Sequence, residues 1–300
     1  MAITVTQLTA FLAVVRGGSV TAAADELVVT QPSVSSAIAA LGRELGCELF
    51  ERAGRGISLT DAGTAFVPYA ADVIGLLAQG REAAREAAEV AARRLRIAAV
   101  TTAAESFVPP LMRSFSARHP DIELTLDVGN RDYVFDRVLN HTADVALSGK
   151  PPADERLVAE PLMDNEIACI TAPDDAAANG KPVDAAALGH RSWLLREPGS
   201  GTRVLGEQFL AERGLRPRTL TLGSNGAIKQ AARAGLGVSL ISRAAVDAEL
   251  AAGRLGEVRL ADGPPSRPWF VLRSAVGPTR APVEAFIRFL VAESGRPSRA

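Results

Sequence analysis

Apolar residues near the start of the chain recur with the spacing of three short amphipathic helices. The intervals i, i+3, i+4 and i+7 predict helices from Thr6 to a glycine pair at 17–18, over 20–27 and over 31–45. Ser19 and Thr30 suit the N-cap position, and glycine suits the left-handed conformation that follows a helix end. The predicted buried faces consist of Leu8, Phe11, Leu12 and Val15, then Val20, Ala23, Ala24 and Leu27, then Val34, Ile38, Leu41 and Leu45.

The third predicted helix carries small polar side chains on its outer face, at its N-terminal end. Pro32 lies in the first turn, where its missing N–H costs little. Two short helices, a turn and such a third helix match a helix-turn-helix, whose slim leading end enters the major groove. Glutamine can pair with adenine, and serine can bind bases or phosphates. The alternative is an ordinary three-helix subdomain with a solvated serine face. The candidate DNA contacts here are Thr30, Gln31, Pro32, Ser33, Ser35 and Ser36.

The next segment predicts a β-hairpin followed by a long helix. Short apolar runs at 49–50 and 57–59 predict two strands, with Gly54 and Gly56 in the turn between them. Such a wing would let Arg52 and Arg55 reach phosphates or a minor groove. The helix extends to about Ala92, and its apolar seam near period 3.5 suits either a partner copy or a core within one chain.

From Arg93 onward, apolar strands alternate with helical stretches up to a last helix at 283–292, which favours parallel α/β layers. Ligands in such sheets bind beyond the carboxyl ends of strands, near helix N-termini. Four segments have this form, and the segments at 196–203 and 223–229 combine glycine with serine, threonine or asparagine. Each could equally be a purely structural helix cap. The candidate residues are Thr101, Thr102, Asn130, Arg131, Arg196, Ser200, Thr202, Arg203 and Asn225.

The charge of the chain gives no sign of a nucleic-acid partner. The net charge is −1, and residues 1–60 contain four arginines, no lysine and five acidic residues. A DNA reader with this charge neutralises few phosphates per subunit. Its affinity must then come also from helix N-termini and from several copies acting together.

The two cysteines, Cys47 and Cys169, lack metal-ligand spacing, and we expect two small buried side chains in a reducing compartment. No stretch approaches the roughly 20 apolar residues of a membrane span. The N-terminus has neither the basic region nor the apolar core of an export signal. We therefore expect a cytoplasmic protein with no membrane partner.

The segment "LTAFLAVVRGGSVTAAADELVVTQPSVSSAIAALGRELGCELFERAGRGISLTDAG" resembles the winged helix-turn-helix of LysR-type transcriptional regulators. The alanine-rich second helix, the Gln-Pro step and the Leu-Thr-x-x-Gly exit of the wing all occur in register. The resemblance implies double-stranded operator DNA as a partner, with contacts from the candidate residues above. It also implies a homodimer through the long helix, and a homotetramer on two half-sites. Ser36 departs from the family, which more often has arginine there, and this changes the expected operator sequence and affinity.

The resemblance implies three parts. Residues 1–60 form an all-α winged helix-turn-helix, and 61–92 form the linker and dimerisation helix. Residues 93–300 form a two-lobed α/β effector domain of the type 2 periplasmic-binding-protein-like kind. Lobe I spans about 93–165 and 268–300, and lobe II about 166–267, with crossovers near 163–168 and 266–271.

Within the family, the segments "GNRDYVFDRV", "DVALSGKPP" and "LLREPGSGTR" look like the regulators of carbon-dioxide-fixation (Calvin-cycle) operons. Those relatives respond to phosphorylated or carboxylated metabolites and nucleotides. This implies a small anionic effector between the lobes, held by the candidate residues of the α/β part. Gly226 departs from these relatives, which usually have glutamate there, so the ligand can differ.

The sequence leaves three other classes of protein as alternatives: an enzyme, a solute-binding protein and a metabolite sensor. An enzyme is disfavoured because "GLGVSL" lacks the third glycine of a dinucleotide fingerprint and "PGSGT" lacks the frame of a nucleophile elbow. A solute-binding protein would need an export signal. The strongest alternative is a metabolite-binding sensor with weak or lost DNA binding, because the predicted head is acidic. We therefore expect a regulator with no catalytic residues, no cofactor and no metal site.

Overall fold

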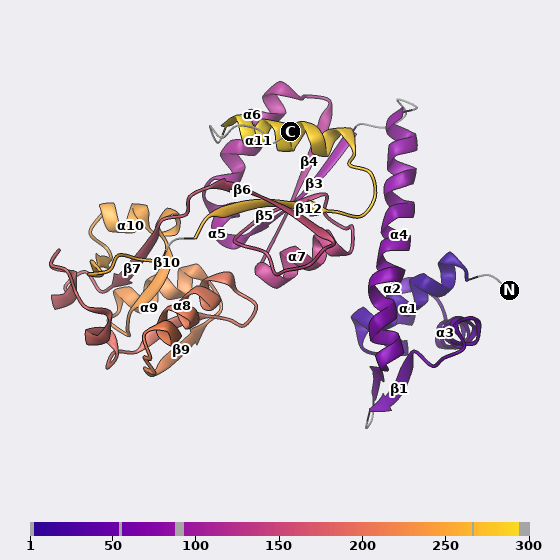
Figure 1. The fold of residues 1–300 in the computed structure, drawn as a ribbon, viewed down its shortest axis with the longest axis horizontal. Helices are drawn as coiled ribbons and strands as arrows, with labels where there is room; N and C mark the ends of the chain where they lie inside the picture. The colour runs from indigo at the N-terminus through magenta and orange to yellow at the C-terminus, as the bar shows by residue number, and fades with distance from the viewer. Residues whose placement is uncertain (1–2, 54–55, 88–92, 266, 294–300) are drawn as a thin grey trace. The chain divides into compact units, whose positions relative to one another are not determined.

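The computed structural model describes residues 3–53, 56–87, 93–265 and 267–293 (Figure 1). The chain divides into two compact units. One consists of Met1–Ala91 with Leu139–Thr142, and the other of Ala92–Val138 with Ala143–Ala300. In the described part of the chain, no helix is long and apolar enough to cross a membrane.

Three short helices form the head of the first unit, as the sequence predicts: α1 (Val5–Gly17), α2 (Val20–Leu27) and α3 (Gln31–Leu45). Hydroxyl side chains cap all three, because Thr4, Ser19 and Thr30 each accept a hydrogen bond from a backbone N–H of the first turn. Phe11 and Leu41 are fully buried at the centre of the head. Burial of apolar surface on these facing stripes therefore fixes how the three helices pack.

The wing and the long helix follow. Strands β1 (Phe50–Ala53) and β2 (Gly56–Leu59) pair antiparallel, and α4 spans Asp61–Ala87. The predicted end of this helix at 88–92 lies outside the described residues. The apolar residues of α4 form two stripes. Phe66 and Ala70 belong to the first, which packs into the head core, and the second stripe is exposed. That stripe consists of Tyr69, Val73 and Leu77, which are 69%, 51% and 37% exposed.

Lobe I of the second unit is built on a five-stranded sheet with the order β4-β3-β5-β12-β6. Its strands are β3 (Arg93–Val100), β4 (Ile122–Gly129), β5 (Val145–Ser148), β6 (Leu157–Met163) and β12 (Trp269–Ser274). Apolar residues on α6 (Val108–Arg118) and α11 (Ala281–Glu293) cover one face of the sheet, and those on α7 (Arg131–Leu139) cover the other (Figure 1). The short helix α5 (Thr101–Glu105) directly follows β3.

Lobe II contains two small sheets. One has the order β10-β7-β11, and the other pairs β8 with β9. The strands are β7 (Ile167–Thr171), β8 (Trp193–Arg196), β9 (Thr219–Leu222), β10 (Ser239–Ser242) and β11 (Gly256–Glu257). The helices are α8 (Gly201–Glu212), α9 (Asn225–Arg233) and α10 (Asp247–Ala251), with 3-10 turns at Ala176–Ala178, Ala185–Leu188 and Arg243–Ala245. Trp193 is fully buried in the core beneath α8.

The expected parallel pairing occurs in both lobes, since β8 is parallel to β9 in lobe II, but each lobe also contains antiparallel pairs. Strands β3, β4 and β5 run parallel, but β12 is antiparallel to β5 and to β6. In lobe II, both β10 and β11 are antiparallel to β7. In lobe I, the antiparallel direction of β12 follows from the double connection between the lobes. The chain leaves lobe I after β6 and returns through β12, so the returning strand must enter the sheet in the opposite direction.

The two cysteines differ in environment. Cys169 is buried in β7, and burial raises the pKa of its thiol to about 12. Cys47 is exposed just after the C-terminal end of α3. The expected burial is therefore wrong for Cys47, because the helix has already ended at Gly46 and no apolar stripe continues past it.

One residue of the head has an unfavourable backbone conformation. Val28, in the turn between α2 and α3, has φ 56° and ψ 46° and is 89% exposed. A β-branched residue in the left-handed region is strained, whereas asparagine tolerates this conformation. We expect Val28→Asn to stabilise the head by about 1 kcal/mol. Hydrogen exchange of the amides of α1 and α3 should then slow by roughly fivefold.

Val29→Asn provides the control for this prediction, because it also replaces an exposed valine while Val29 has no positive φ. Equal slowing of exchange in the two variants would show that surface polarity, and not backbone strain, is responsible.

Candidate functional sites

The N-terminal tip of α3 presents a small polar surface to solvent. Gln31, Pro32, Ser33, Ser35 and Ser36 are all exposed, while Val34 beside them is buried in the head core. Thr30 caps the helix, and its hydroxyl also lies 2.8 Å from the Ser33 hydroxyl. Within the described residues, no hydrogen bond occupies the side chains of Gln31, Ser35 or Ser36. Their donors and acceptors are therefore free for an external partner.

The wing adds little positive charge to this surface. Arg52 lies on β1 and is exposed, with no ion pair to any described residue, whereas Arg55 lies outside the described residues. Arg16 of α1 pairs with Glu26 at 2.5 Å, so its charge is locally balanced. A ligand of the head must therefore be bound with few free cations.

The second unit, called the effector unit after the domain expected from the sequence, contains a small cavity at the ends of the strands of both lobes. Most of the residues predicted for an effector line it. Its volume is about 20 Å³, enough for roughly one water molecule. The predicted residues on its wall are Thr101, Thr102, Asn130, Arg131, Arg196, Ser200 and Thr202. They come together because β3, β4 and β8 end at the same place and helices α5, α7 and α8 begin there.

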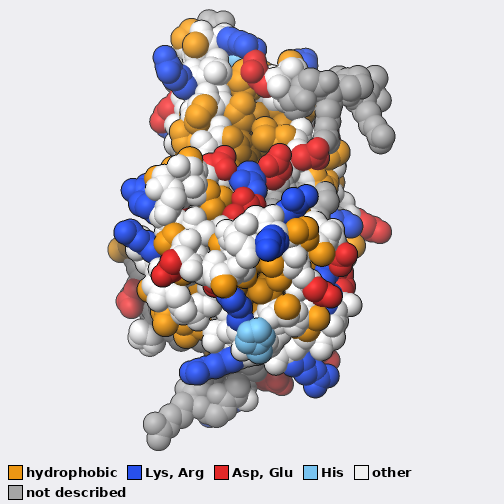
Figure 2. All heavy atoms as spheres, turned by 90° about the vertical axis from the view of Figure 1, so that its left-hand side faces the viewer, with side chains coloured by type: hydrophobic (Ala, Val, Ile, Leu, Met, Phe, Trp, Pro, Cys, Tyr) orange, Lys and Arg blue, Asp and Glu red, His pale blue; other side chains and the backbone are white. Residues whose placement is uncertain are grey.

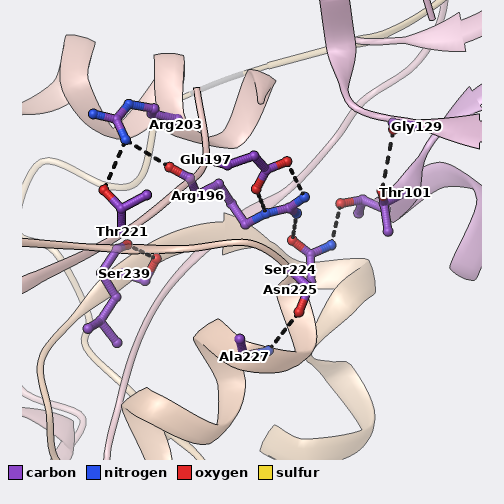
Figure 3. Close-up of polar contacts among 12 residues, drawn as sticks. Thr101, Gly129, Arg196, Glu197, Arg203, Thr221, Ser224, Asn225, Ala227 and Ser239 are labelled. Atoms are coloured by element: carbon purple, nitrogen blue, oxygen red, sulfur yellow. Dashed lines mark hydrogen bonds and ion pairs between the residues drawn. The ribbon is translucent and has the colours of Figure 1, made fainter. Parts of the chain in front are cut away.

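Arg196 is the most buried cation of the cavity, and its charge is fully used inside the protein (Figure 3). Glu197 accepts hydrogen bonds from Nε at 2.7 Å and from Nη2 at 2.9 Å. Asn225 accepts a third from Nη1. This bidentate pairing neutralises the guanidinium. Arg196 therefore contributes shape and a fixed hydrogen-bond network to the cavity but no free positive charge.

Asn225 links the two lobes behind the cavity wall. Its side-chain Nδ2 donates to the Thr102 hydroxyl at 2.8 Å, while its Oδ1 accepts from Arg196. Thr102 belongs to α5 of lobe I, and Asn225 opens α9 of lobe II. Both side chains are at least nine-tenths buried. Asn225, which the sequence predicted as an effector ligand, thus lies one layer behind the cavity.

Arg203 is not brought to the cavity. Its guanidinium donates to the backbone oxygen of Arg196 and to the Thr221 hydroxyl, and it pairs with Glu207 (Figure 3). The side chain leaves the first turn of α8 toward β8 and β9, and not toward the cavity. The glycine- and serine-rich loop did predict the helix start, but it could not indicate on which side of the helix the third residue would lie.

The N-terminal end of α8 supplies polar groups to the cavity. Ser200 is the N-cap residue, is 4% exposed and makes no side-chain capping bond. In the described structure, its hydroxyl and the first N–H groups of this twelve-residue helix have no protein acceptor or donor. These groups carry partial positive charge at the helix end. The arrangement suits an oxyanion.

Sequence reasoning missed eight residues that line the cavity: Val100, Gly129, Asn165, Gly201, Leu205, Ser242, Arg267 and Trp269. Asn165 and Arg267 lie on the two crossovers between the lobes, and Ser242 ends β10 and donates to Asn165 at 2.6 Å. A usable signal existed, because a chain segment that connects two lobes must pass along the cleft between them. Polar residues at 163–168 and 266–271 were therefore candidates by position alone.

Two arginines of the cavity retain positive charge. Arg131 stacks on the Phe135 ring at 4.7 Å and pairs with Asp132 only at 3.6 Å, on the solvent side. Arg267 has no hydrogen bond or ion pair with any described residue. Burial, and next the charge of Arg131, lowers its pKa to about 10, so it stays protonated at neutral pH. No Asp or Glu lines the cavity with them.

Outside the cavity, charges of both signs are mixed. Figure 2 shows Lys and Arg interspersed with Asp and Glu on one face, with apolar side chains between them. Among the described residues, no group of three or more His, Cys, Asp or Glu side chains is placed to hold a metal ion.

Comparison with known proteins assigns the family. The profile described as "LysR substrate binding domain" matches residues 88–295, and "Bacterial regulatory helix-turn-helix protein, lysR family" matches residues 5–64. The RuBisCO operon transcriptional regulator of Allochromatium vinosum is 35% identical over 297 residues, which cover 99% of this chain and 98% of that protein. The chain therefore belongs to the LysR family of bacterial transcriptional regulators, which are not enzymes.

Two solved structures are similar in fold. The CcmR regulatory domain from Synechocystis PCC6803, in complex with 2-PG, is 32% identical with a TM-score of 0.63. The match covers 67% of this chain and 97% of that one. Full-length CbnR, complexed with its target DNA, is 23% identical with a TM-score of 0.61 over 97% and 99% of the two chains. The winged head followed by a two-lobed α/β domain, expected from the sequence, is confirmed.

The Arg196 network gives a direct stability prediction. Asn225→Leu removes the acceptor of a buried guanidinium and the donor to Thr102. We expect a loss of about 1–3 kcal/mol in the free energy of unfolding, because a buried charged donor is left without its partner. Urea denaturation followed by tryptophan fluorescence measures this, since both tryptophans, Trp193 and Trp269, belong to the effector unit.

The matched control is Asn179→Leu, an exposed asparagine whose side chain accepts only a turn hydrogen bond. Its effect should stay within about 0.5 kcal/mol. A similar loss in both variants would show that the hydrogen bonds of Asn225 add no more to the free energy of unfolding than an exposed turn hydrogen bond.

Proposed function

We propose that this protein is a sequence-specific, DNA-binding transcriptional regulator controlled by a small anionic metabolite bound between the two lobes. The observation that carries the proposal is the pairing of two features in one chain. One is an exposed helix tip with free hydrogen-bonding groups, and the other is an interior cavity with uncompensated positive charge. The proposal places the protein in the cytoplasm, where its operator DNA is.

The tip of α3 supports the DNA-binding half. Small leading side chains let the backbone of a helix approach the base edges in the major groove, and the serines at 33, 35 and 36 fit this. Gln31 at the first helical position has a free amide that can pair with adenine. We propose that Thr30 orients this tip, that Pro32 packs on the DNA backbone and that Arg52 and Arg55 reach phosphates from the wing.

The weak positive charge of the head requires more than one copy on the DNA. Tyr69, Val73 and Leu77 form an exposed apolar stripe along α4 at intervals of four residues. We propose that a second copy covers this stripe to form a homodimer, and that two dimers form a tetramer on two half-sites. Joining several heads multiplies weak contacts, because each later contact becomes intramolecular.

The cavity supports the effector-binding half. Arg131 and Arg267, the Ser200 hydroxyl and the N–H groups of α8 all present positive charge or donors to one space. A space of about 20 Å³ is too small for a metabolite, so binding requires the lobes to separate and close again around the ligand. The Thr102–Asn225 hydrogen bond spans the lobes and must yield during this movement.

Control then follows from differential affinity. A ligand shifts an equilibrium between assembly shapes only if it binds one of them better, and a tenfold preference corresponds to about 1.4 kcal/mol per site. The heads would then move between half-sites and change the bend of the DNA.

The DNA-binding half is tested with Gln31→Ala. Loss of the amide should reduce discrimination between the DNA upstream of its own gene and a scrambled fragment by roughly five- to a hundredfold. Fluorescence anisotropy at two salt concentrations measures both affinities, since the non-specific part depends strongly on salt. Binding of a metabolite in the other unit should be unaffected.

Gln208→Ala is the control, because Gln208 is exposed on α8 and bonds only Glu212. If the wild-type protein shows no sequence-selective binding up to micromolar concentrations, the alternative holds, and the protein is a metabolite sensor without useful DNA binding. The acidic head is the observation that favours that alternative.

The effector half is tested by a thermal-shift screen of phosphorylated sugars, nucleotides and small carboxylates, because a ligand that binds the folded state stabilises it. Arg131→Gln should reduce the shift produced by any positive compound, since the cavity loses a free charge. The same variant should retain wild-type affinity for operator DNA in the absence of ligand. Loss of DNA binding with an unchanged ligand shift would contradict the assignment of the two sites.

A further inference from the structure

The strongest unexplained feature of the effector unit is Arg267. It lies on the second crossover, two residues before β12, and belongs to neither of the strand-to-helix loops that supply the other polar groups. Its guanidinium is held between one glycine from each lobe. A Cβ at Gly149 would come within 2.5 Å of its Nη2, and a Cβ at Gly201 would come within 2.2 Å of the same atom.

The packing against these two glycines fixes Arg267 in the wall of the cavity. Gly149 follows β5 of lobe I, and Gly201 is the first residue of α8 in lobe II. Neither glycine has the positive φ that would require it for the backbone. The space that their missing side chains leave is filled by the guanidinium. Glycine at both positions therefore leaves space for the guanidinium of Arg267 on the segment that joins the lobes.

The charge of Arg267 has no protein partner, although it lies beside another cation. The same Cβ position at Gly201 is 3.4 Å from Cδ of Arg131, so both arginines meet at the first residue of α8. Arg131 has weak partners of its own: the Lys150 carbonyl at 3.4 Å and Asp132 on the solvent side. Two half-buried like charges side by side are unfavourable unless a counter-charge lies between them.

Arg196 shows how this protein neutralises a cation when it needs only structure. There, Glu197 follows directly in the sequence, and its two carboxylate oxygens accept from Nε and Nη2 along one edge of the guanidinium. Asp132 likewise follows Arg131 in the sequence, but it pairs only at 3.6 Å on the solvent side and does not line the cavity. Arg267 has no ion pair with any described residue. The cavity wall therefore holds two guanidinium groups and no carboxylate.

We propose that Arg267 is the specificity-determining residue of the effector site, and that with Arg131 it selects an effector whose bound group carries two negative charges. This inference rests on the proposed function, which requires only some anion in the cleft. Both arginines line the cavity at the N-terminal end of α8, where the Ser200 hydroxyl and the free N–H groups provide the remaining donors. A singly charged group would leave one arginine uncompensated.

The test uses the full-length protein and two simple probes, tungstate and perrhenate. Both are tetrahedral oxyanions of nearly equal size, and the first carries two negative charges while the second carries one. Isothermal titration calorimetry at mildly alkaline pH gives the affinity of each for the wild type, Arg267→Gln, Arg267→Lys and Gly201→Ala. Arg259→Gln is the matched control, because it removes one exposed positive charge from lobe II away from the cavity.

We expect the wild type to prefer tungstate by about tenfold or more, as the loss of one charge-assisted contact implies. Arg267→Gln should weaken tungstate binding by a similar factor and affect perrhenate much less, so the preference disappears. Gly201→Ala should have the same effect, because its Cβ displaces the guanidinium. Arg267→Lys should retain most of the preference, and Arg259→Gln all of it.

Equal affinities for the two anions in the wild type, or an undiminished preference in Arg267→Gln, would overturn the inference while leaving an anion site in place. If neither anion binds to the wild type, the anionic effector of the proposed function fails together with the inference. Operator binding, measured by anisotropy in the same preparations, shows whether the DNA-binding half of the proposal stands independently. If Arg267→Gln does not fold, the tungstate preferences of Gly201→Ala and Arg267→Lys are compared instead. A preference that is equal in these two variants would overturn the inference.

Discussion

A buried guanidinium must keep its partners, and this constraint at Arg196 organises the effector unit. Its hydrogen bonds fix Glu197 at the end of β8 and Asn225 at the start of α9, and Asn225 in turn holds Thr102 of the other lobe. Three strand ends are thereby tied to one charged group. Because a buried charge without partners is costly, a movement of the lobes must break the Asn225–Thr102 link while sparing the pairs inside lobe II.

The difference between Arg196 and the other two arginines explains why the cavity can attract an anion. Arg196 is satisfied within lobe II, so it behaves as a fixed part of the wall. Arg267 has no partner among the described residues and Arg131 only weak ones, and the two come from the crossover and from lobe I. A bound anion would therefore join groups from different parts of the unit, which is the condition for a ligand to alter how those parts are arranged.

Sequence reasoning succeeded wherever the signal was local. Hydroxyl caps and apolar stripes predicted α1, α2 and α3 because capping and amphipathicity are properties of neighbouring residues. Strand ends predicted seven of the fifteen residues of the cavity wall for the same reason. The antiparallel strands β10 and β12, the position of Arg203 outside the cavity and the role of Arg267 depend on which segments meet in space. Spacing along the chain carries no information on such meetings.

The charge of the head also has a consequence for how an operator is found. With four arginines against five acidic residues, and Arg16 already paired, one head holds random duplex only weakly at cellular ionic strength. A regulator that slides along DNA needs such non-specific retention. This head would leave the duplex soon after each encounter and locate its target by repeated three-dimensional collisions, so that long residence begins only when several heads find matching half-sites together.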